Sequence, residues 1–277
     1  MTGLAVTAHG LVHIYRSEGN DVVALSGVDL HVRAGQMVAL LGPSGSGKST
    51  LISLLAGLQR PSAGRLHIGD TDVAALDEPG LDELRAGSLG VVVQGAVANL
   101  LPYATAERNV AFAQRAVRAR RPDLPEPGEV LELVGLAEVA DASPASLTPG
   151  QLQRLAVAVG MAGLPGLLLA DEPTSQLDHR YRDEVIDAMH RLNRQIGTTV
   201  VAVTHDPMVA ARMHRTITIR DGRVGAEGLA GEEYAVIGSD GSLQLPPELR
   251  DRLPSGTLVR VVPMPDGTIV LDPREDL

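Results

Sequence analysis

The sequence has no cysteine, no tryptophan, one phenylalanine and four tyrosines among its 277 residues. Without cysteine it can form neither a disulfide framework nor a thiolate metal site, which agrees with a reducing compartment. No run approaches the roughly 20 apolar residues that cross a bilayer. The N-terminus lacks the basic and apolar segments of a secretory signal. We therefore expect a soluble, cytoplasmic chain with one sizeable core.

Positive charge is scarce as well. Lysine and arginine total 24 against 34 acidic residues, which gives a formal net charge of −10. Phosphate binding along nucleic acids draws on clustered Lys and Arg, so this balance argues against a broad nucleic-acid surface, although it does not exclude a local basic patch. We expect no nucleic-acid partner.

Lys48 is the single lysine of the chain, and every other basic side chain is arginine. Arginine presents a broad planar fork, whereas lysine is a compact charge on a flexible stem. A site that must place a cation between phosphates cannot exchange the two. The retained lysine therefore predicts a functional role for Lys48.

The order of apolar segments predicts an α/β fold. Two extended segments around a turn-like cluster open the chain, over residues 4–32, and a strand, a glycine-rich loop and a helix follow. The strands are expected at Met37–Leu41, Leu89–Val93, Leu167–Ala170 and Thr198–Val203, and the helices at Ser49–Leu58, at His179–Ile196 and between Ala104 and Gly160, with a break at Pro122–Pro127. The small residues from Gly225 to Gly231 suggest a linker.

One segment matches the P-loop pattern in full and lies between the expected strand and helix: Gly42-Pro43-Ser44-Gly45-Ser46-Gly47-Lys48-Ser49, followed by Thr50. Glycines let backbone N–H groups turn inward around phosphate oxygens, and the helix N-terminus faces the same anion. We expect the segment to bind a nucleoside triphosphate, with Lys48 at the β- and γ-phosphates and Ser49 on Mg²⁺. The alternative is a flexible strand-to-helix turn.

The apolar strand at residues 167–170 ends in two carboxylates, Asp171 and Glu172. Alone, they could be an ordinary strand end. Downstream of a P-loop, Asp171 is placed to hold the Mg²⁺ shell, and Glu172 to accept a proton from the attacking water. Together the two motifs predict a P-loop NTPase.

Further motifs narrow the class of NTPase: Gln94 after a strand, Leu147-Thr148-Pro149-Gly150-Gln151, Ser175-Gln176-Leu177-Asp178, and Thr204-His205-Asp206. With these motifs, the chain resembles ABC-type ATPases over residues 4–227 in order, spacing and residue type. The resemblance implies an ABC ATPase domain at 1–228, with an N-terminal antiparallel β subdomain and a helical subdomain at about 95–160.

The resemblance also implies roles for single residues. Gln94 would sense the metal and the γ-phosphate, and His205 would contact the γ-phosphate. Thr148, Gly150 and Gln151 would serve the nucleotide of an opposite subunit, Asp178 would lie at the dimer seam, and Tyr15 would stack on adenine. Taken singly, each is an ordinary polar or packing residue as readily as a ligand.

Within this superfamily the sequence looks most like the lipoprotein-release, macrolide-export and cell-division group. The similarity rests on Tyr15 with Gly19, Val23-Ala24-Leu25, Asn99-Leu100-Leu101-Pro102, Glu107-Arg108-Asn109-Val110 and Arg220-Asp221-Gly222-Arg223. It implies the ATP-hydrolysing subunit of a transporter, working as a homodimer or heterodimer beneath an integral membrane permease, peripheral on the inner face of the cell membrane.

The family signature is normally Leu-Ser-Gly-Gly-Gln, and here Thr148 and Pro149 depart from it. Thr148 and Gln151 have the spacing of a capping box, and Pro149 fits the first helical position, where its missing N–H has no intrahelical partner to lose. If that N–H stabilises the transition state, its loss costs about 2.7 to 4 kcal/mol, or roughly 10²- to 10³-fold in rate. We expect a functional ATPase, whose hydrolysis is slow if that N–H is needed.

The segment from Tyr234 to Asp272 contains the stretches Gly241–Arg250, Gly256–Val261 and Gly267–Leu271. With these stretches it resembles the swapped-hairpin module of AbrB-type regulators, which suggests a small, mostly β appendix at 229–277. Four arginines face nine acidic residues there, so dimerisation or regulation is the better inference than DNA contact.

Three functional hypotheses remain open: a motor for a permease, a slow regulatory ATPase that uses ATP as dimer glue, and a translation- or repair-type ABC protein without permease. The last usually has duplicated ATPase halves or a long coiled insertion, and neither is present in the sequence.

Overall fold

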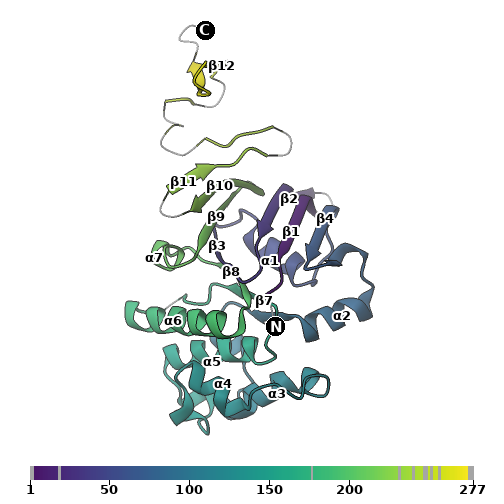
Figure 1. The fold of residues 1–277 in the computed structure, drawn as a ribbon, viewed down its shortest axis with the longest axis vertical. Helices are drawn as coiled ribbons and strands as arrows, with labels where there is room; N and C mark the ends of the chain where they lie inside the picture. The colour runs from purple at the N-terminus through teal and green to yellow at the C-terminus, as the bar shows by residue number, and fades with distance from the viewer. Residues whose placement is uncertain are drawn as a thin grey trace.

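The computed structural model describes residues 3–17, 20–175, 177–229, 232–238, 241–245, 249, 252–254 and 257–273. Its α/β architecture combines two large sheets with helices that cover the larger one (Figure 1). The expected α/β class, with an antiparallel N-terminal part, is confirmed.

The N-terminal sheet is antiparallel, in the order β2-β1-β4-β5. Its strands are β1 (Val6–Ser17), β2 (Asn20–Val32), β4 (Ala63–Ile68) and β5 (Thr71–Asp72). The long β1–β2 pair is the predicted pair of extended segments, and residues 18 and 19 of its turn lie outside the described residues.

The larger sheet has seven strands in the order β11-β10-β9-β3-β8-β7-β6, parallel from β9 to β6 and antiparallel at β10 and β11. The strands are β3 (Met37–Leu41), β6 (Leu89–Val92), β7 (Leu167–Asp171), β8 (Thr199–Val203), β9 (Arg215–Arg220), β10 (Arg223–Leu229) and β11 (Glu232–Ala235). A separate hairpin joins β12 (Val259–Pro263) to β13 (Ile269–Pro273).

The helices among the described residues are α1 (Lys48–Leu55), α2 (Glu78–Gly87), α3 (Ala106–Arg118), α4 (Pro127–Leu133), α5 (Pro149–Met161), α6 (His179–Ile196) and α7 (Pro207–Ala210), with short 3₁₀ turns at Val73–Ala75, Ala96–Asn99, Ala137–Val139 and Pro144–Ser146. The expected helical region therefore contains α3, α4 and α5. α1 ends three residues before its expected end, because Gly57 takes a φ of 63° and closes the helix.

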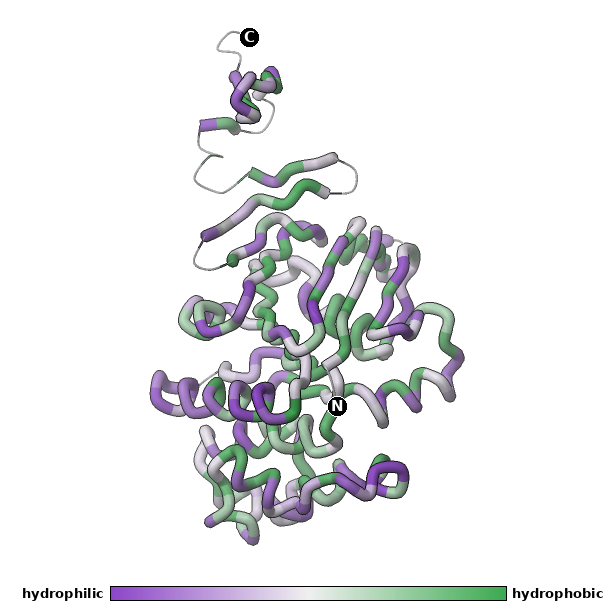
Figure 2. The backbone as a smooth tube through the Cα atoms, viewed as in Figure 1, coloured by the Kyte–Doolittle hydropathy of each residue, from purple (hydrophilic) through white to green (hydrophobic). Residues whose placement is uncertain are grey.

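Two hydrophobic cores lie on opposite faces of the seven-stranded sheet. Successive side chains of a strand point to opposite faces: in β3, Met37 and Ala39 join the core beneath α3–α6, whereas Val38 and Leu40 join the core shared with the N-terminal sheet and α1. Figure 2 shows the hydrophobic residues along these central strands and hydrophilic ones along α3 and α6. Burial on both faces explains why these strands read as continuous apolar runs.

The prediction of a linker at 225–231 is wrong for residues 225–229. Residues 225–229 belong to β10, which pairs with β9 on one side and with β11 on the other. Gly228 is paired with both neighbouring strands. Gly225 lies at a bulge between Val224 and Ala226, where its carbonyl oxygen accepts the Val236 N–H at 3.2 Å, so backbone hydrogen bonds override the weak strand preference of both glycines. The sheet therefore runs beyond residue 228, while the division of the chain at 228/229 stays a prediction.

None of the helices in the described ranges is both long enough and apolar enough to span a bilayer.

Candidate functional site

A cleft of about 530 Å³ opens where the tip of the β1–β2 pair meets the loop before α1 and the carboxyl ends of β6, β7 and β8. Ends of parallel strands next to a helix N-terminus are the usual binding edge of an open α/β sheet. Its lining residues are Tyr15, Val22, Val23, Ala24, Ser44, Gly45, Gly47, Lys48, Ser49, Thr50, Gln94, Asp171, Glu172, Val203 and His205. The cleft thus brings together residues from both sheets.

The loop at residues 42–47 has a shape that only glycine allows at two positions. Gly42 has φ 140° and Gly47 φ 103°, and an added Cβ would lie 2.0 Å from the Ile219 carbonyl oxygen or 2.5 Å from the Ala24 carbonyl oxygen. Gly47 caps α1, so the unpaired N–H groups of that helix face the cleft. Within the described residues, Ser46 Oγ is buried and has no hydrogen-bond partner. This cradle fits an anion of phosphate size.

Lys48 lies at the start of α1 and lines the cleft. Its Nζ donates to the carbonyl oxygens of Gly42 and Pro43, both at 2.8 Å. The ammonium group is therefore held across the mouth of the loop.

Asp171 ends β7 beside Ser49. Burial, and then the negative charge of Glu172, raise the pKa of Asp171, and the hydrogen bond from Ser49 and the charge of Lys48 offset this only in part. A cation near these oxygens would stabilise the ionised carboxylate. Mg²⁺ is usually held by one or two carboxylates together with substrate phosphates, and the donor set of Ser49, Asp171 and Gln94 fits that mode.

Glu172 turns from the strand end into the cleft. Its φ of 50° is unusual for a residue with a side chain, and its N–H donates to the Val203 carbonyl at 3.0 Å. The carboxylate lies 2.9 Å from His205 Nδ1. The Glu172 side chain is 13% exposed and that of His205 73%, so a carboxylate that can accept a proton lies in the cleft, with a histidine at its rim.

Tyr15 is 40% exposed at the edge of the cleft. Its hydroxyl lies 3.2 Å from Thr50 Oγ1 and donates to Gln59 at 3.1 Å, while its ring meets His13 edge-on. Adenine stacking by Tyr15 stays a prediction.

The signature residues and Asp178 are not in this cleft. The predicted capping box is confirmed: Thr148 Oγ1 accepts from the Gln151 N–H at 3.3 Å, and the Thr148 N–H donates to Gln151 Oε1 at 2.9 Å, with Pro149 in the first turn of α5. Asp178 caps α6 by accepting the Tyr181 N–H. Gln176 lies outside the described residues.

Four apolar lining residues had no predicted site role: Val22, Val23, Ala24 and Val203. Tyr15 pairs with Val22 across the β1–β2 ladder, so a strand register could have placed the first three beside Tyr15. The register of β1 against β2 could not be predicted, because the sequence of the turn between them does not determine it.

Comparisons with known proteins agree on one family, whose matching members include lipoprotein-release, macrolide-export and methionine-import proteins. The family model described as ABC transporter matches residues 25–175. The lipoprotein-releasing system ATP-binding protein LolD of Anaeromyxobacter dehalogenans is 45% identical over 206 residues, which is 74% of this chain and 85% of that protein. The macrolide export ATP-binding/permease protein MacB of Rhodopseudomonas palustris is 37% identical over 276 residues, which is 95% of this chain but 41% of that protein.

Solved structures agree in fold. A dimeric ATP-binding cassette in a post-hydrolysis state with bound ADP and Pi superimposes with a TM-score of 0.70 at 33% identity, over 81% of this chain and 98% of that chain.

Proposed function

The chain belongs to the ABC transporter family of ATP-binding proteins, and on that premise we propose that its cleft binds Mg²⁺-ATP and that Glu172 and His205 carry the hydrolysis step. It is an ATPase cassette of this family. The observation that carries the assignment of residues is the convergence of Lys48, Ser49, Asp171, Glu172 and His205 on one cleft.

Each group has a role that follows from its place. The loop amides and Lys48 bind the phosphates, and the ring of Tyr15 offers a face for the base. Mg²⁺, held by Ser49, Gln94 and Asp171, would neutralise charge that develops on the phosphate oxygens. Glu172 accepts the proton of the attacking water, and His205 holds the terminal phosphate and orients the Glu172 carboxylate.

Hydrolysis is tested by phosphate release from purified protein with ATP and Mg²⁺. Replacing Glu172→Gln removes the base and keeps the shape, so the rate should fall by about 10²- to 10⁴-fold. A wild-type rate no higher than that of Glu172→Gln would contradict the proposed function.

The reaction centre is completed by a second copy of the chain or by a related subunit. Thr148, Gly150 and Gln151 lie outside the cleft of their own subunit, at the N-terminus of α5, where N–H groups and a hydroxyl can face a nucleotide held by the neighbour. Asp178 would lie at the seam between the two. The dimeric cassette among the solved structures supports this arrangement.

A membrane permease is the proposed partner. The segment between Gln94 and α3 exposes two apolar side chains, Val97 at 60% and Tyr103 at 83%. Asn99 fixes this segment by exchanging hydrogen bonds with the Val93 backbone at 2.8 and 2.9 Å. Gln94 at its start can therefore relay nucleotide occupancy to a permease, which would hold the chain at the inner face of the membrane, as in the lipoprotein-release and macrolide-export group.

The permease contact is tested by co-purification from membranes, with the bound integral protein identified by mass spectrometry. Tyr103→Asp should abolish recovery, because a charge replaces the most exposed apolar group of the segment. Recovery of the same integral protein with Tyr103→Asp would refute this contact.

A slow regulatory ATPase is a second candidate function, in which bound ATP mainly holds two subunits together. It is favoured by Pro149, which occupies the first turn of α5 and has no N–H to offer to a neighbouring phosphate. A turnover rate well below one per second would favour this regulatory role over a motor.

We assign the segment at 229–277 to dimerisation or regulation, in the manner of AbrB-like modules. In the β12–β13 hairpin the cross-strand pairs Val261–Leu271 and Pro263–Ile269 share one wholly apolar face, with Val261 61% and Ile269 63% exposed. Figure 1 shows the hairpin away from the two large sheets. A lone two-stranded hairpin is marginal in water, so a partner hairpin of a second copy would cover this face.

The hairpin contact is tested by light scattering without nucleotide. Val261→Asp should give monomers, because it places a charge on the apolar face, whereas Val270→Asp, on the neighbouring strand and the opposite face, is the matched control. The same mass for both variants and the wild type would exclude this dimer contact.

A further inference from the structure

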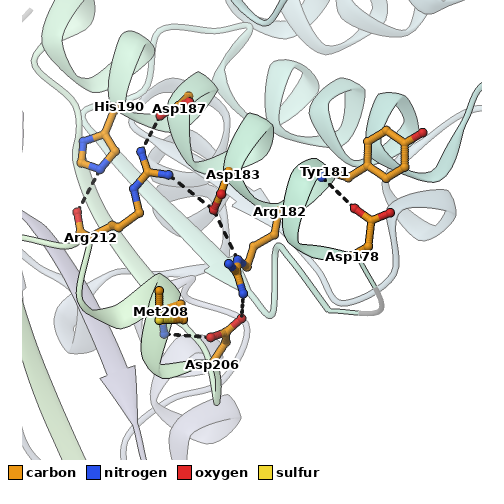
Figure 3. Close-up of polar contacts among 9 residues, drawn as sticks. All are labelled: Asp178, Tyr181, Arg182, Asp183, Asp187, His190, Asp206, Met208 and Arg212. Carbon is orange, nitrogen blue, oxygen red and sulfur yellow. Dashed lines mark hydrogen bonds and ion pairs between the residues drawn. The ribbon is translucent and has the colours of Figure 1, made fainter.

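The first turn of α6 carries two side chains that contact separate parts of the nucleotide machinery. Asp178 caps the helix, and Tyr181 and Arg182 are the third and fourth residues of the helix that follows (Figure 3). Consecutive helical residues project about 100° apart, so Tyr181 and Arg182 face different neighbours. One neighbour is the loop that holds His205, and the other is the signature residue Gly150.

Arg182 is a buried cation, with a side chain 9% exposed. Its Nη1 donates to Asp206 Oδ2 at 3.0 Å, and its Nε lies 3.4 Å from Asp183 Oδ1. Asp183 in turn lies 3.6 Å from Arg212. A buried charge is stable only with its partner, so the Arg182–Asp206 pair fixes the distance between α6 and the His205 loop.

Asp206 is held on both carboxylate oxygens. Oδ1 accepts the Met208 N–H at 2.8 Å and caps α7, and Oδ2 accepts from Arg182. Burial alone would raise the pKa of Asp206, but the Met208 hydrogen bond together with the hydrogen bond and charge of Arg182 lower it below its ordinary value. The carboxylate is therefore ionised and paired near neutral pH.

His205 depends on these neighbours for its place. Its side chain is 73% exposed, so little packing holds it, and its Nδ1 lies 2.9 Å from the Glu172 carboxylate. On the preceding side Thr204 is fully buried, and its N–H donates to the Leu40 carbonyl at 3.1 Å. After His205 in the chain comes Asp206, whose carboxylate is held by Arg182.

Tyr181 ties the same turn to the signature. A Cβ added at Gly150 would lie 2.5 Å from Tyr181 Cδ1 and 2.7 Å from Cγ, so the ring rests against the Gly150 backbone. The ion pair between Arg154 of α5 and Glu184 of α6, at 3.2 Å, holds the two helices together one turn further on. A movement of the α5 N-terminus therefore moves the turn that carries Arg182.

We propose that Arg182 is a positioning residue for ATP hydrolysis, which holds His205 in place through Asp206 and, with Tyr181, connects the signature end of α5 to the His205 loop of the same subunit. The inference rests on the proposed function, since it needs His205 to act on the terminal phosphate. The signature would serve the neighbour's nucleotide and His205 its own. The first turn of α6 thus links the two nucleotide sites of a dimer.

The test compares steady-state ATP hydrolysis by full-length variants that all keep the catalytic side chains. Arg182→Gln leaves Asp206 without its cation, and Asp206→Asn breaks the same pair while keeping an oxygen for the Met208 N–H. In the double variant an amide can again donate to an amide oxygen. Arg180→Gln makes the same chemical change two residues away, at an 84% exposed side chain, and is the matched control.

Each single variant of the pair should lower kcat by about 10- to 100-fold, the effect of misplacing a reacting group by about 1 Å. KM for ATP should stay within about twofold, because the phosphate cradle is untouched. Arg180→Gln should match the wild type, and the double variant should recover most of the lost kcat. Melting curves confirm that each variant is folded.

The proposal is overturned if a folded Arg182→Gln or Asp206→Asn keeps kcat within about twofold of wild type, if the defect is a raised KM at unchanged kcat, or if the double variant is as slow as the singles. Should Arg182→Gln not fold, Asp206→Asn, which is nearly the same shape as the native residue, decides alone. A wild-type rate no higher than that of Glu172→Gln would instead refute the proposed function, which distinguishes that failure from a failure of the role of Arg182.

Discussion

Replacing Gly150 with alanine is expected to destabilise the protein by forcing α5 away from α6. The new methyl group would lie 2.5, 2.7 and 2.9 Å from Cδ1, Cγ and Cβ of Tyr181. Carbon atoms in contact normally lie about 3.5 to 4.0 Å apart, so one helix must move by roughly 1 Å. Overpacking of this kind typically costs about 1 to 3 kcal/mol.

Gly128 provides a closely matched control, because it too follows a proline in the first turn of a helix, α4. An added Cβ there meets only Glu107 Oε1, at 4.0 Å. Both variants gain the helix preference of alanine over glycine, up to about 1 kcal/mol, and only Gly150→Ala adds the clash. The difference between them therefore isolates the overpacking, and it corresponds to about 2 to 12 °C in melting temperature.

The assay is thermal unfolding followed by circular dichroism, at one protein concentration and without nucleotide. Adding Tyr181→Ala to Gly150→Ala removes the ring that the methyl group meets, so the effects of the two changes should be non-additive by about 0.5 to 3 kcal/mol. If Gly150→Ala and Gly128→Ala melt within about 1 °C of each other, the contact between Tyr181 and Gly150 does not limit the packing of α5 on α6, and the reasoning fails.

Three further predictions concern binding, rate and pH. Lys48→Arg should lose ATP binding as fully as Lys48→Ala, because the planar fork cannot replace an ammonium held 2.8 Å from two loop carbonyls; calorimetric titration that finds native affinity for the arginine variant would contradict this. Pro149→Gly should raise kcat, by up to roughly 10²-fold, if the restored N–H reaches the neighbour's phosphate, and an unchanged rate would show that this donor is not needed. Burial, ahead of nearby positive charges, lowers the pKa of His190 below its ordinary 6.5, so the unfolded chain binds that proton more readily and stability falls as the pH drops below that value. His190→Gln should show a shallower loss of melting temperature between about pH 7.5 and 5.5, and equal slopes for the two proteins would argue against it.

Several elements of the fold could be predicted from local pattern alone. Met37–Leu41 and His179–Ile196 have the bounds that their apolar spacing indicates. The strand-loop-helix order around the glycine-rich segment is also as predicted, because φ freedom, helix capping and apolar period are properties of neighbouring residues. The capping box of Thr148 and Gln151 is of the same local kind.

Other features depended on residues far apart in the chain. The glycine-containing segment at 225–229 reads as a linker by composition, yet it is a strand because β9 and β11 flank it. The cleft gains Val22, Val23 and Ala24 only through the register of β1 against β2.

The sequence by itself determined which residues can bind phosphate, because a P-loop is a contiguous pattern whose backbone shape follows from its glycines. Only the tertiary structure decided that Arg182 faces Asp206, 24 residues later, and that Tyr181 rests on Gly150. Each pair joins two elements that are separated in the sequence, and their contact is set by how α5, α6 and the sheet pack together. The local pattern of residue types along the chain does not determine that packing.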